Sequence, residues 1–425
     1  MYKSSLLLAS ICCMFSLNVN AAASFMGGEH IYIGNKLALK IDNDLPAQAN
    51  LSFVLQNGAK LTYGEAIAMG DAYGIEKAPI SQGATPIERE QRFVAAFNTM
   101  DLDVNAAAEI PKIISILNQE FTTVQDALTK GIPAHKAYRD ASNETDRQLN
   151  CLTGGGCDPA TWWMKFGRTM RLGSTNFDHF GDAAWLAYEA GHHMAMRMAL
   201  HAKQSSDINY LHRAYAMNAF ASHFLMDRYA TGHMRTPRGA FVEHVTPASI
   251  GNVLMRYMHD EENAGLNVHN AAGQQWRATG DGYAFEKDAA TQEKFVIDAL
   301  QHSADEIYAV YQSGQIVENQ EQQLAMLPNA DETNGVCKND VAQMFIWDAL
   351  SGQLLRRDNL RDKHACKWTS SWWGWSTLLE LKKIGQDDLS IAEQAQLAQT
   401  TYAMDAVKSG LINDKDIIGY VRSRR

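Results

Sequence analysis

The chain has 425 residues, of which 46% are hydrophobic, 20% charged and 9% aromatic, and its formal net charge is −10. At ~100–200 residues per domain, this length predicts two or three domains, or one large domain with additions. The composition excludes a disordered chain, and the acidic charge argues against non-specific nucleic-acid binding, which needs a basic face. Ten of the 14 histidines lie between His179 and His269, which is an uneven distribution that needs a cause.

The N-terminal residues have the features of a secretory signal. Lys3 supplies a positive charge, residues 6–19 form an apolar run, and the small residues of 20–24 offer a cleavage site. The apolar run is shorter than the ~20 residues of a membrane-spanning helix. We therefore expect residues 1–23 to be removed and the protein to be secreted.

Four cysteines follow the expected signal, and an even number in an exported chain suggests two disulfides. Proximity along the chain favours the pairs Cys151–Cys157 and Cys337–Cys366. The alternative is that these residues are free thiols or metal ligands. It is disfavoured because neither pair has the spacing of a zinc ribbon.

The spacing of apolar residues predicts a mainly α protein with a small N-terminal hairpin. Asn57-Gly58 is a hairpin turn signal between residues 51–56 and 60–63. Further along, helices are expected over residues 111–120, 122–130, 133–149, 182–202, 207–230 and 250–263. Glycines between residues 267 and 283 predict a loop and a possible domain boundary. Beyond it, helices are expected over residues 287–313, 341–355 and 391–409, with a loop over residues 327–338.

Four of the nine tryptophans lie within eight residues, at Trp368, Trp372, Trp373 and Trp375. This cluster could dock on a membrane, because indole rings favour the level of the lipid headgroups. It could also pack the C-terminal half against the rest of the protein. We favour the second interpretation, because large aromatic side chains are usually buried.

The strongest local signal for a functional site is the pair His223 and Asp227, followed by His233. Residues four apart on a helix share a face, with Cβ atoms ~5–6 Å apart, so both side chains can reach one ion. Imidazole nitrogen and carboxylate oxygen are common zinc ligands. Gly232 allows the chain to turn, so that His233 can return to the same place. An isolated pair of this kind is more often only a hydrogen-bonded pair.

Other histidines are candidates or are excluded by their position. His179 follows Asp178 just before the helix expected from residue 182, His259 precedes three acids, and His30 lies soon after the cleavage site. His212 lies 11 residues before His223, ~16 Å along a helix, so the two cannot share an ion. The remaining histidines of the expected helices are interpreted as packing or surface residues: His192, His193 and His201.

The run from Ala214 to Asp227, with the histidine six residues beyond it, resembles the zinc-dependent phospholipase C and single-strand nuclease superfamily. Its members carry the sequence HxxxD on a helix and a further histidine at that spacing. The segments 29–34 and 179–180 resemble other histidine segments of the same enzymes. The contexts of residues 178–180, 232–235 and 259–260 are most similar to the secreted Legionella-type zinc phospholipase C group. The resemblance covers roughly residues 30–270.

This resemblance implies a mostly helical domain that holds three zinc ions. The ligands that it implies are His30, His179, His223, Asp227, His233 and His259. The chain departs from the superfamily pattern in three places. Asn263 stands where an acid is usual, so Glu262 or Asp260 is expected to substitute. No tryptophan lies near the cleavage site to act as an N-terminal ligand, and the bridging aspartate has no clear match, with Asp178 the nearest candidate.

The function implied is that of a secreted zinc metallophospholipase C. It would hydrolyse the glycerol–phosphate bond of phosphatidylcholine or related phospholipids to diacylglycerol and a phosphorylated headgroup. Coordination to zinc lowers the pKa of water to ~7 and so supplies a nucleophile. Asp178 and Asp227 are the candidate catalytic carboxylates. Arg235 and Arg238 are candidate phosphate contacts, with surface salt bridges as the alternative.

The expected signal, the resemblance and the glycine-rich loop together divide the chain into a signal over residues 1–23, a catalytic domain over 24–280 and a helical C-terminal region over 281–425. A phospholipid substrate, transient contact with a membrane surface and a monomeric state are expected, without a nucleic-acid partner. Two alternatives remain open: a zinc-dependent nuclease with the same metal cluster, and a zinc-stabilised membrane-binding protein without catalysis.

Overall fold

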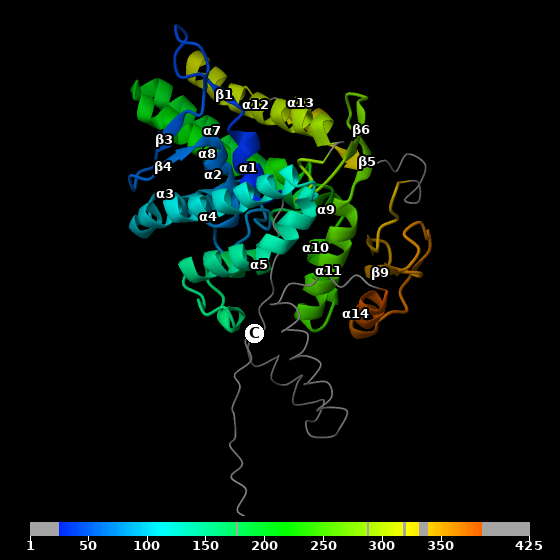
Figure 1. Cartoon of the computed structure of the whole chain (residues 1–425). Helices are drawn as coiled ribbons and strands as arrows, with labels where there is room; N and C mark the ends of the chain where they lie inside the picture. Colours follow the sequence, from blue (N-terminus) through cyan, green and yellow to red (C-terminus); the bar gives the residue numbers. More distant parts are fainter. Residues whose placement is uncertain (1–24, 176, 287–288, 318–319, 331–338, 385–425) are drawn as a thin grey trace, which may run out of the picture.

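The computed structural model describes residues 25–175, 177–286, 289–317, 320–330 and 339–384 (Figure 1). Helices dominate these residues, which confirms the expected mainly α fold. In chain order the α-helices are α1 (Gly27–Gly34), α2 (Tyr63–Ala68), α3 (Pro86–Asp101), α4 (Val104–Thr129), α5 (Ala134–Leu152), α6 (Arg168–Ser174), α7 (Gly181–Ser205), α8 (Ile208–Asp227), α9 (Thr231–Met234), α10 (Arg238–His244), α11 (Ala248–Asn263), α12 (Ala289–Ser313), α13 (Gln320–Met326) and α14 (Gly374–Lys383).

The strands are short and antiparallel, and they form four small sheets in the described part of the chain. Their bounds are β1 (Ala38–Leu39), β2 (Gln48–Ala49), β3 (Ser52–Val54), β4 (Lys60–Thr62), β5 (Leu266–His269), β6 (Gln275–Ala278), β7 (Asn329–Ala330), β8 (Phe345–Asp348), β9 (Gln353–Arg357) and β10 (Trp368–Thr369). The expected N-terminal hairpin is confirmed, since β3 pairs with β4 around Gly58, whose φ is +89°.

Helix α8 lies at the centre of the larger hydrophobic core. Every residue from Ala214 to Asp227 is buried, and α2, α7 and α12 pack around the helix (Figure 1). Small side chains allow the helices to come close. A Cβ atom at Gly191 of α7 would lie 2.6 Å from the Cβ atom of Ala221, which is too close for any side chain. The position of α8 is therefore set by close contact on several sides.

A second core lies between α11 and the C-terminal elements. Apolar residues of α11 pack against the sheet of order β10-β9-β8 and against α14, and this group lies together in Figure 1. Helix α12, although beyond the expected boundary at residue 280, belongs to the first core with α7 and α8. The boundary itself stays a prediction. No described helix combines the length and the hydropathy needed to cross a membrane.

Two expectations about secondary structure are wrong. The helix expected over residues 341–355 is instead the hairpin of β8 and β9, because Phe345-Ile346-Trp347 favour a strand and Gly352 supplies a turn with φ +64°. The loop expected over residues 267–283 contains the hairpin of β5 and β6. In addition, the two helices expected on either side of residue 121 are one helix, α4, which continues through Pro111.

The disulfide Cys151–Cys157 is present, at the end of α5 and in the loop that follows. Cys337 lies outside the described residues, as do the expected signal sequence and the helix expected over residues 391–409. The pair Cys337–Cys366 therefore stays a prediction.

A buried ion pair joins the C-terminal sheet to α11. The guanidinium of Arg357, at the end of β9, donates from Nη1 to Glu261 Oε1 at 2.8 Å and from Nη2 to Glu261 Oε2 at 3.2 Å. The same group donates to the carbonyls of Ala342 and Leu360. Both side chains are almost fully buried, so neither charge has water as an alternative partner.

We predict that Arg357→Met lowers the free energy of unfolding by ~3–5 kcal/mol, because it leaves the Glu261 carboxylate buried without its main partner. The double variant Glu261→Met/Arg357→Met should recover most of this loss. Urea denaturation followed by circular dichroism measures both. The exposed Arg361→Met is the matched control, and a loss as small as that of the control would contradict a structural role for the pair.

Candidate metal centre

Helix α1 brings His30 into the core. Its ring is fully buried, and Nε2 lies 3.8 Å from Asp227 Oδ1 of α8. The helix can lie this deep because its last residue meets another glycine: a Cβ atom at Gly34 would lie 2.6 Å from the Cα atom of Gly64 at the start of α2. The N-terminal histidine expected as a ligand therefore reaches the same place as the HxxxD segment.

The expected pair on α8, His223 and Asp227, lies next to His179, which precedes α7. His223 Nε2 lies 3.5 Å from Asp227 Oδ2, and His179 Nδ1 lies 2.7 Å from the same oxygen. One atom from each of His179, His223 and Asp227 lies within 4.8 Å of the others, which is a geometry that can hold a metal ion. All three side chains are buried.

Asp71 completes a neighbouring group that the sequence did not identify. It ends a short 3₁₀ helix (Met69–Asp71), and its Oδ1 lies 3.5 Å from His223 Nε2. One atom from each of His30, Asp71 and His223 also lies within 4.8 Å of the others. His223 therefore belongs to this group and to the group with His179 and Asp227. Gly70 permits this approach, because a Cβ atom there would lie 2.3 Å from His223 Cγ.

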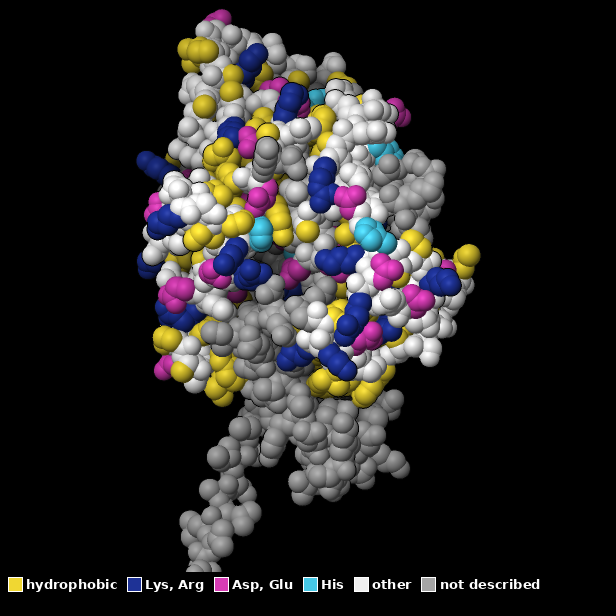
Figure 2. Space-filling view, turned by 45° about the vertical axis from the view of Figure 1, so that its right-hand side comes forward, with side chains coloured by type: hydrophobic (Ala, Val, Ile, Leu, Met, Phe, Trp, Pro, Cys, Tyr) yellow, Lys and Arg dark blue, Asp and Glu magenta, His cyan; other side chains and the backbone are white. Residues whose placement is uncertain are grey.

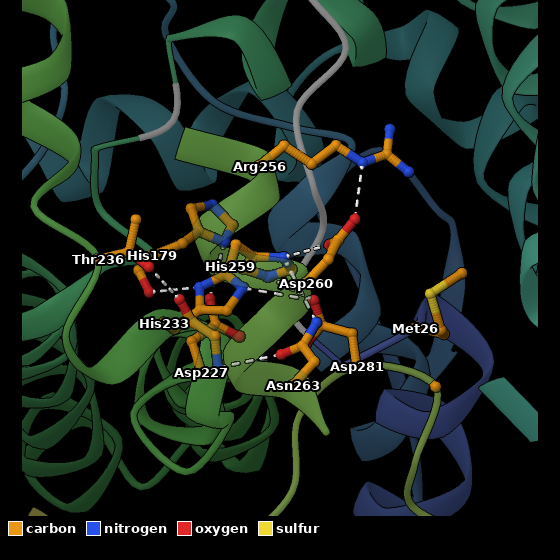
Figure 3. Close-up of polar contacts among 12 residues, drawn as sticks. Met26, His179, Asp227, His233, Thr236, Arg256, His259, Asp260, Asn263 and Asp281 are labelled. Atoms are coloured by element: carbon orange, nitrogen blue, oxygen red, sulfur yellow. Dashed lines mark hydrogen bonds and ion pairs between the residues drawn. The ribbon is translucent and has the colours of Figure 1, made fainter. Parts of the chain in front are cut away.

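The third group consists of His233, His259 and Asp281 (Figure 3). His259 Nε2 lies 2.8 Å and His233 Nε2 lies 3.5 Å from Asp281 Oδ2. The remaining nitrogen of each ring is occupied: Nδ1 of His233 lies 2.8 Å from the His179 carbonyl, and Nδ1 of His259 lies 2.8 Å from Asp260 Oδ1. These contacts direct both Nε2 atoms toward Asp281, as second contacts commonly do for metal-binding histidines.

Asn263 occupies the position where the resemblance implies an acid, and its side chain makes a structural contact. Its Oδ1 accepts a hydrogen bond from the amide of Gly232 at 3.0 Å. The segment before Asp281 lies against the same side chain, since a Cβ atom at Gly280 would lie 1.8 Å from Asn263 Oδ1. Asp281 from the loop after β6 thus takes the place beside His259.

Glu262, one of the two expected substitutes, lies elsewhere. Its carboxylate is buried and pairs with Arg235 Nη2 at 2.9 Å, and it belongs to none of the three groups found among the described residues. Asp260, the other substitute, contacts the outer nitrogen of His259. A ligand role for Glu262 stays a prediction that this geometry does not favour.

The two expected phosphate contacts make hydrogen bonds inside the protein. Arg235 donates to the Val341 carbonyl in addition to its pairing with Glu262. Arg238 donates to Asn252 Oδ1 and to the Ser174 carbonyl, and burial lowers its pKa to about 10. Contact of either guanidinium with a substrate remains a prediction.

Asp178 holds a loop beside the centre. Its carboxylate accepts hydrogen bonds from the amides of Ile80 and Ser81 and from the Ser81 hydroxyl, at 2.7, 2.8 and 2.5 Å. It lines a cavity of about 60 Å³ together with Asp71 and His179. The catalytic role expected for Asp178 stays a prediction.

The histidines that were interpreted as packing or surface residues belong to none of the three groups. His192 lies between Asn218 and Glu306, and His193 lies 2.5 Å from Glu90. His201 packs against Tyr210, and His212 lies near Phe53. The distance argument that separated His212 from His223 therefore agrees with the structure.

The centre is charged and buried at once. Burial alone would raise the pKa values of Asp227 and Asp281, but the adjacent histidines outweigh it and hold both well below the usual range. Burial alone would likewise lower the pKa of His223, but Asp227 and Asp71 raise it to about 9. Asp281 and Asp260 do the same for His259, whose pKa is also about 9.

The residues fit a group of metal ions. Asp281 Oδ1 is buried without a hydrogen-bond partner, and Asp281 Oδ2 faces two imidazole nitrogens, although an unpartnered polar atom inside a protein is costly. A cation between them would satisfy these atoms. Groups of three nitrogen and oxygen ligands can hold a metal ion and leave a further position for water.

Comparison of the chain with known protein families, curated proteins and solved structures gives no match.

The structure adds two carboxylates, Asp71 and Asp281, to the residues expected from the sequence. Neither has a distinctive signal in the sequence. Asp71 follows Gly70 at the end of the short 3₁₀ helix after α2, upstream of the first histidine of the HxxxD region. Asp281 lies between two glycines, Gly280 and Gly282, in a segment expected to be only a loop.

We predict that Asp281→Asn lowers the zinc content of the purified protein by about one ion per chain, because it removes a ligand oxygen between two histidines. Glu262→Gln is the matched control, since it changes an equally buried acid that pairs with Arg235. Metal analysis by mass spectrometry measures both. If Glu262→Gln loses zinc and Asp281→Asn does not, Glu262 and not Asp281 is the ligand.

We also predict that zinc binding at pH 7.5 releases about two protons per chain, because a metal-binding imidazole must be neutral. With pKa values of about 9, His223 and His259 are protonated at this pH before zinc binds. The apparent affinity should therefore fall as the pH falls below 9. Calorimetry in buffers of different ionisation enthalpy measures the protons released. A binding heat independent of the buffer would contradict this assignment.

Proposed function

We propose that the protein is a secreted zinc metallophospholipase C. It would hydrolyse the glycerol–phosphate bond of phosphatidylcholine or a related phospholipid, releasing diacylglycerol and a phosphorylated headgroup. The observation that carries this proposal is the presence of three adjoining His/Asp groups, two of which share His223. Adjoining cations suit a phosphodiester, whose charge they neutralise on both the attacking and the leaving side.

Zinc ions bound at these groups would lower the pKa of water toward ~7 and polarise the phosphoryl oxygen. The side chains of the chain itself hold and orient the ligands. Asp227 stays ionised at neutral pH because its pKa is held well below the usual range by His223 and His179 despite burial. It can therefore hold a cation and position a nucleophilic water, in the catalytic role that we propose for it, with Asp178 as the second candidate.

A cavity beside Asp71 favours a lipid over a nucleic acid as the substrate. It has a volume of about 90 Å³, and its walls are mostly apolar, with Met26, Ile113, Leu117 and Leu149 among them. The net charge of −10 also disfavours a nucleic acid. The proposal includes export and a monomeric state, and the expected signal lies outside the described residues.

The test is turnover of phosphatidylcholine by the purified protein, with and without a chelator. We predict release of the phosphorylated headgroup, its loss on chelation and its return when zinc is added. Asp227→Ala should lower the rate by at least ~100-fold, because it removes a ligand and an ionised carboxylate from the reacting centre.

His212→Ala is the control, and its rate should equal that of the unaltered protein because His212 lies outside the metal groups. The absence of turnover after zinc has been restored would refute the phospholipase proposal. Digestion of single-stranded nucleic acid under the same conditions, without lipid turnover, would identify a nuclease instead.

A further inference from the structure

Three large apolar side chains are exposed at the C-terminal sheet: Trp347 at 40%, Leu350 at 100% and Trp373 at 53%. Trp347 is on β8, Leu350 is in the turn between β8 and β9, and Trp373 precedes α14. We call these three residues the apolar rim.

The members of the apolar rim belong to one continuous surface. His244, the last residue of α10, stacks on the Trp347 ring with 4.6 Å between ring centroids. The same histidine lines a groove of about 320 Å³ together with Trp373 and with Gly352 of the hairpin turn. The groove therefore connects Trp347, the turn that carries Leu350, and Trp373.

The neighbouring tryptophans have structural roles that the rim residues lack. Trp375 is buried in the second core, and the indoles of Trp368 and Trp372 donate to the carbonyls of Gln343 and Leu354. These contacts agree with the interpretation of the Trp cluster as packing for three of its four members, whereas the fourth, Trp373, is exposed. Within the described part of the chain neither Trp347 nor Trp373 has such a hydrogen bond, and both are exposed.

The segment that carries the apolar rim is less acidic than the rest of the chain, although Asp348 lies beside Trp347 and accepts a hydrogen bond from the amide of Leu350. Residues 339–384 contain seven Lys or Arg and five Asp or Glu residues, whereas the whole chain carries a net charge of −10. Of these cations, Arg361, Lys363, Lys367 and Lys383 are exposed. Figure 2 brings this side of the molecule forward and shows Lys and Arg side chains interspersed with Asp and Glu beside hydrophobic ones. Exposed indoles are typical of proteins that bind at the headgroup level of a bilayer.

We propose that the apolar rim docks the protein on a phospholipid bilayer, with Trp347, Leu350 and Trp373 inserted among the headgroups. This inference goes beyond the proposed hydrolytic function, because it concerns binding to the lipid surface and not reaction with it. Three side chains around a projecting turn are too few for a stable interface between two copies, which covers ~800 Å² on each partner. A bilayer needs no such area, because each apolar side chain that enters it contributes separately.

The test is co-sedimentation of the full chain with vesicles of phosphatidylcholine, with and without phosphatidylglycerol. The incubation is kept short enough that no phosphate release is detected in parallel. We expect Trp347→Ser/Leu350→Ser/Trp373→Ser to weaken vesicle binding at least ~10-fold, because the apolar area that enters the lipid is lost. Phosphatidylglycerol should strengthen binding of the unaltered chain.

A matched control removes three apolar side chains of similar exposure elsewhere. Ile87, Leu102 and Val104 lie on or beside α3 and α4 and are 65%, 47% and 77% exposed. Their triple change to serine should leave vesicle binding unchanged. Thermal unfolding midpoints equal to that of the unaltered chain will show that both triple variants fold.

Equal loss of binding in both triple variants, or no binding by the unaltered chain, would overturn the proposal. Self-association that the rim variant abolishes, without any vesicle binding, would identify a second copy as the occupant and would also overturn it. Hydrolysis of a soluble phosphodiester gives an independent readout of the metal centre. Vesicle binding can be lost in the rim variant alone while neither the unaltered chain nor any variant hydrolyses the soluble ester. In that case the docking proposal is supported and the phospholipase proposal is refuted.

Discussion

The burial of the Asp227 and Asp281 carboxylates inside a helical protein, with the partly buried Asp71 beside Asp227, is the constraint on which this structure depends. A carboxylate removed from water is strongly destabilising unless opposite charge and hydrogen bonds surround it. Asp71, Asp227 and Asp281 each lie within 4 Å of imidazole nitrogens that come from distant parts of the chain. The histidine-bearing elements must therefore approach closely, which explains why contacts such as Gly70 against His223 have no room for a Cβ atom.

The last turn of α11 contacts both the buried carboxylates and other parts of the protein. His259 contacts Asp281, Glu261 pairs with Arg357 of β9, and Asn263 holds the amide of Gly232 just before His233. One turn of helix thus connects a metal group, the C-terminal sheet and the segment that carries the next histidine. The C-terminal sheet, which had no role assigned from the sequence, acts as the support for the helix that presents His259.

Local signals predicted the parts of the fold that depend on local chemistry. The Asn57-Gly58 turn, the helices around HxxxD and the disulfide closed over six residues all follow from neighbours in the chain. The hairpin of β8 and β9 was missed because its stability depends on burial of Phe345 against α10, a contact between residues about 100 positions apart. Short apolar runs are ambiguous between helix and strand until such contacts are known.

The histidines of the centre could be predicted from the sequence, whereas two of its carboxylates could not. Only 14 histidines occur in the chain, so the spacing of His233 from Asp227 was informative, and the resemblance of the segments around them led to His30, His179 and His259. Acids number 48, and a single aspartate in a connection carries almost no information. Asp71 and Asp281 enter the centre because the chain folds back there. Asn263 shows why spacing alone was misleading: its side chain holds Gly232, and the ligand position that it leaves is filled from a loop 18 residues further along.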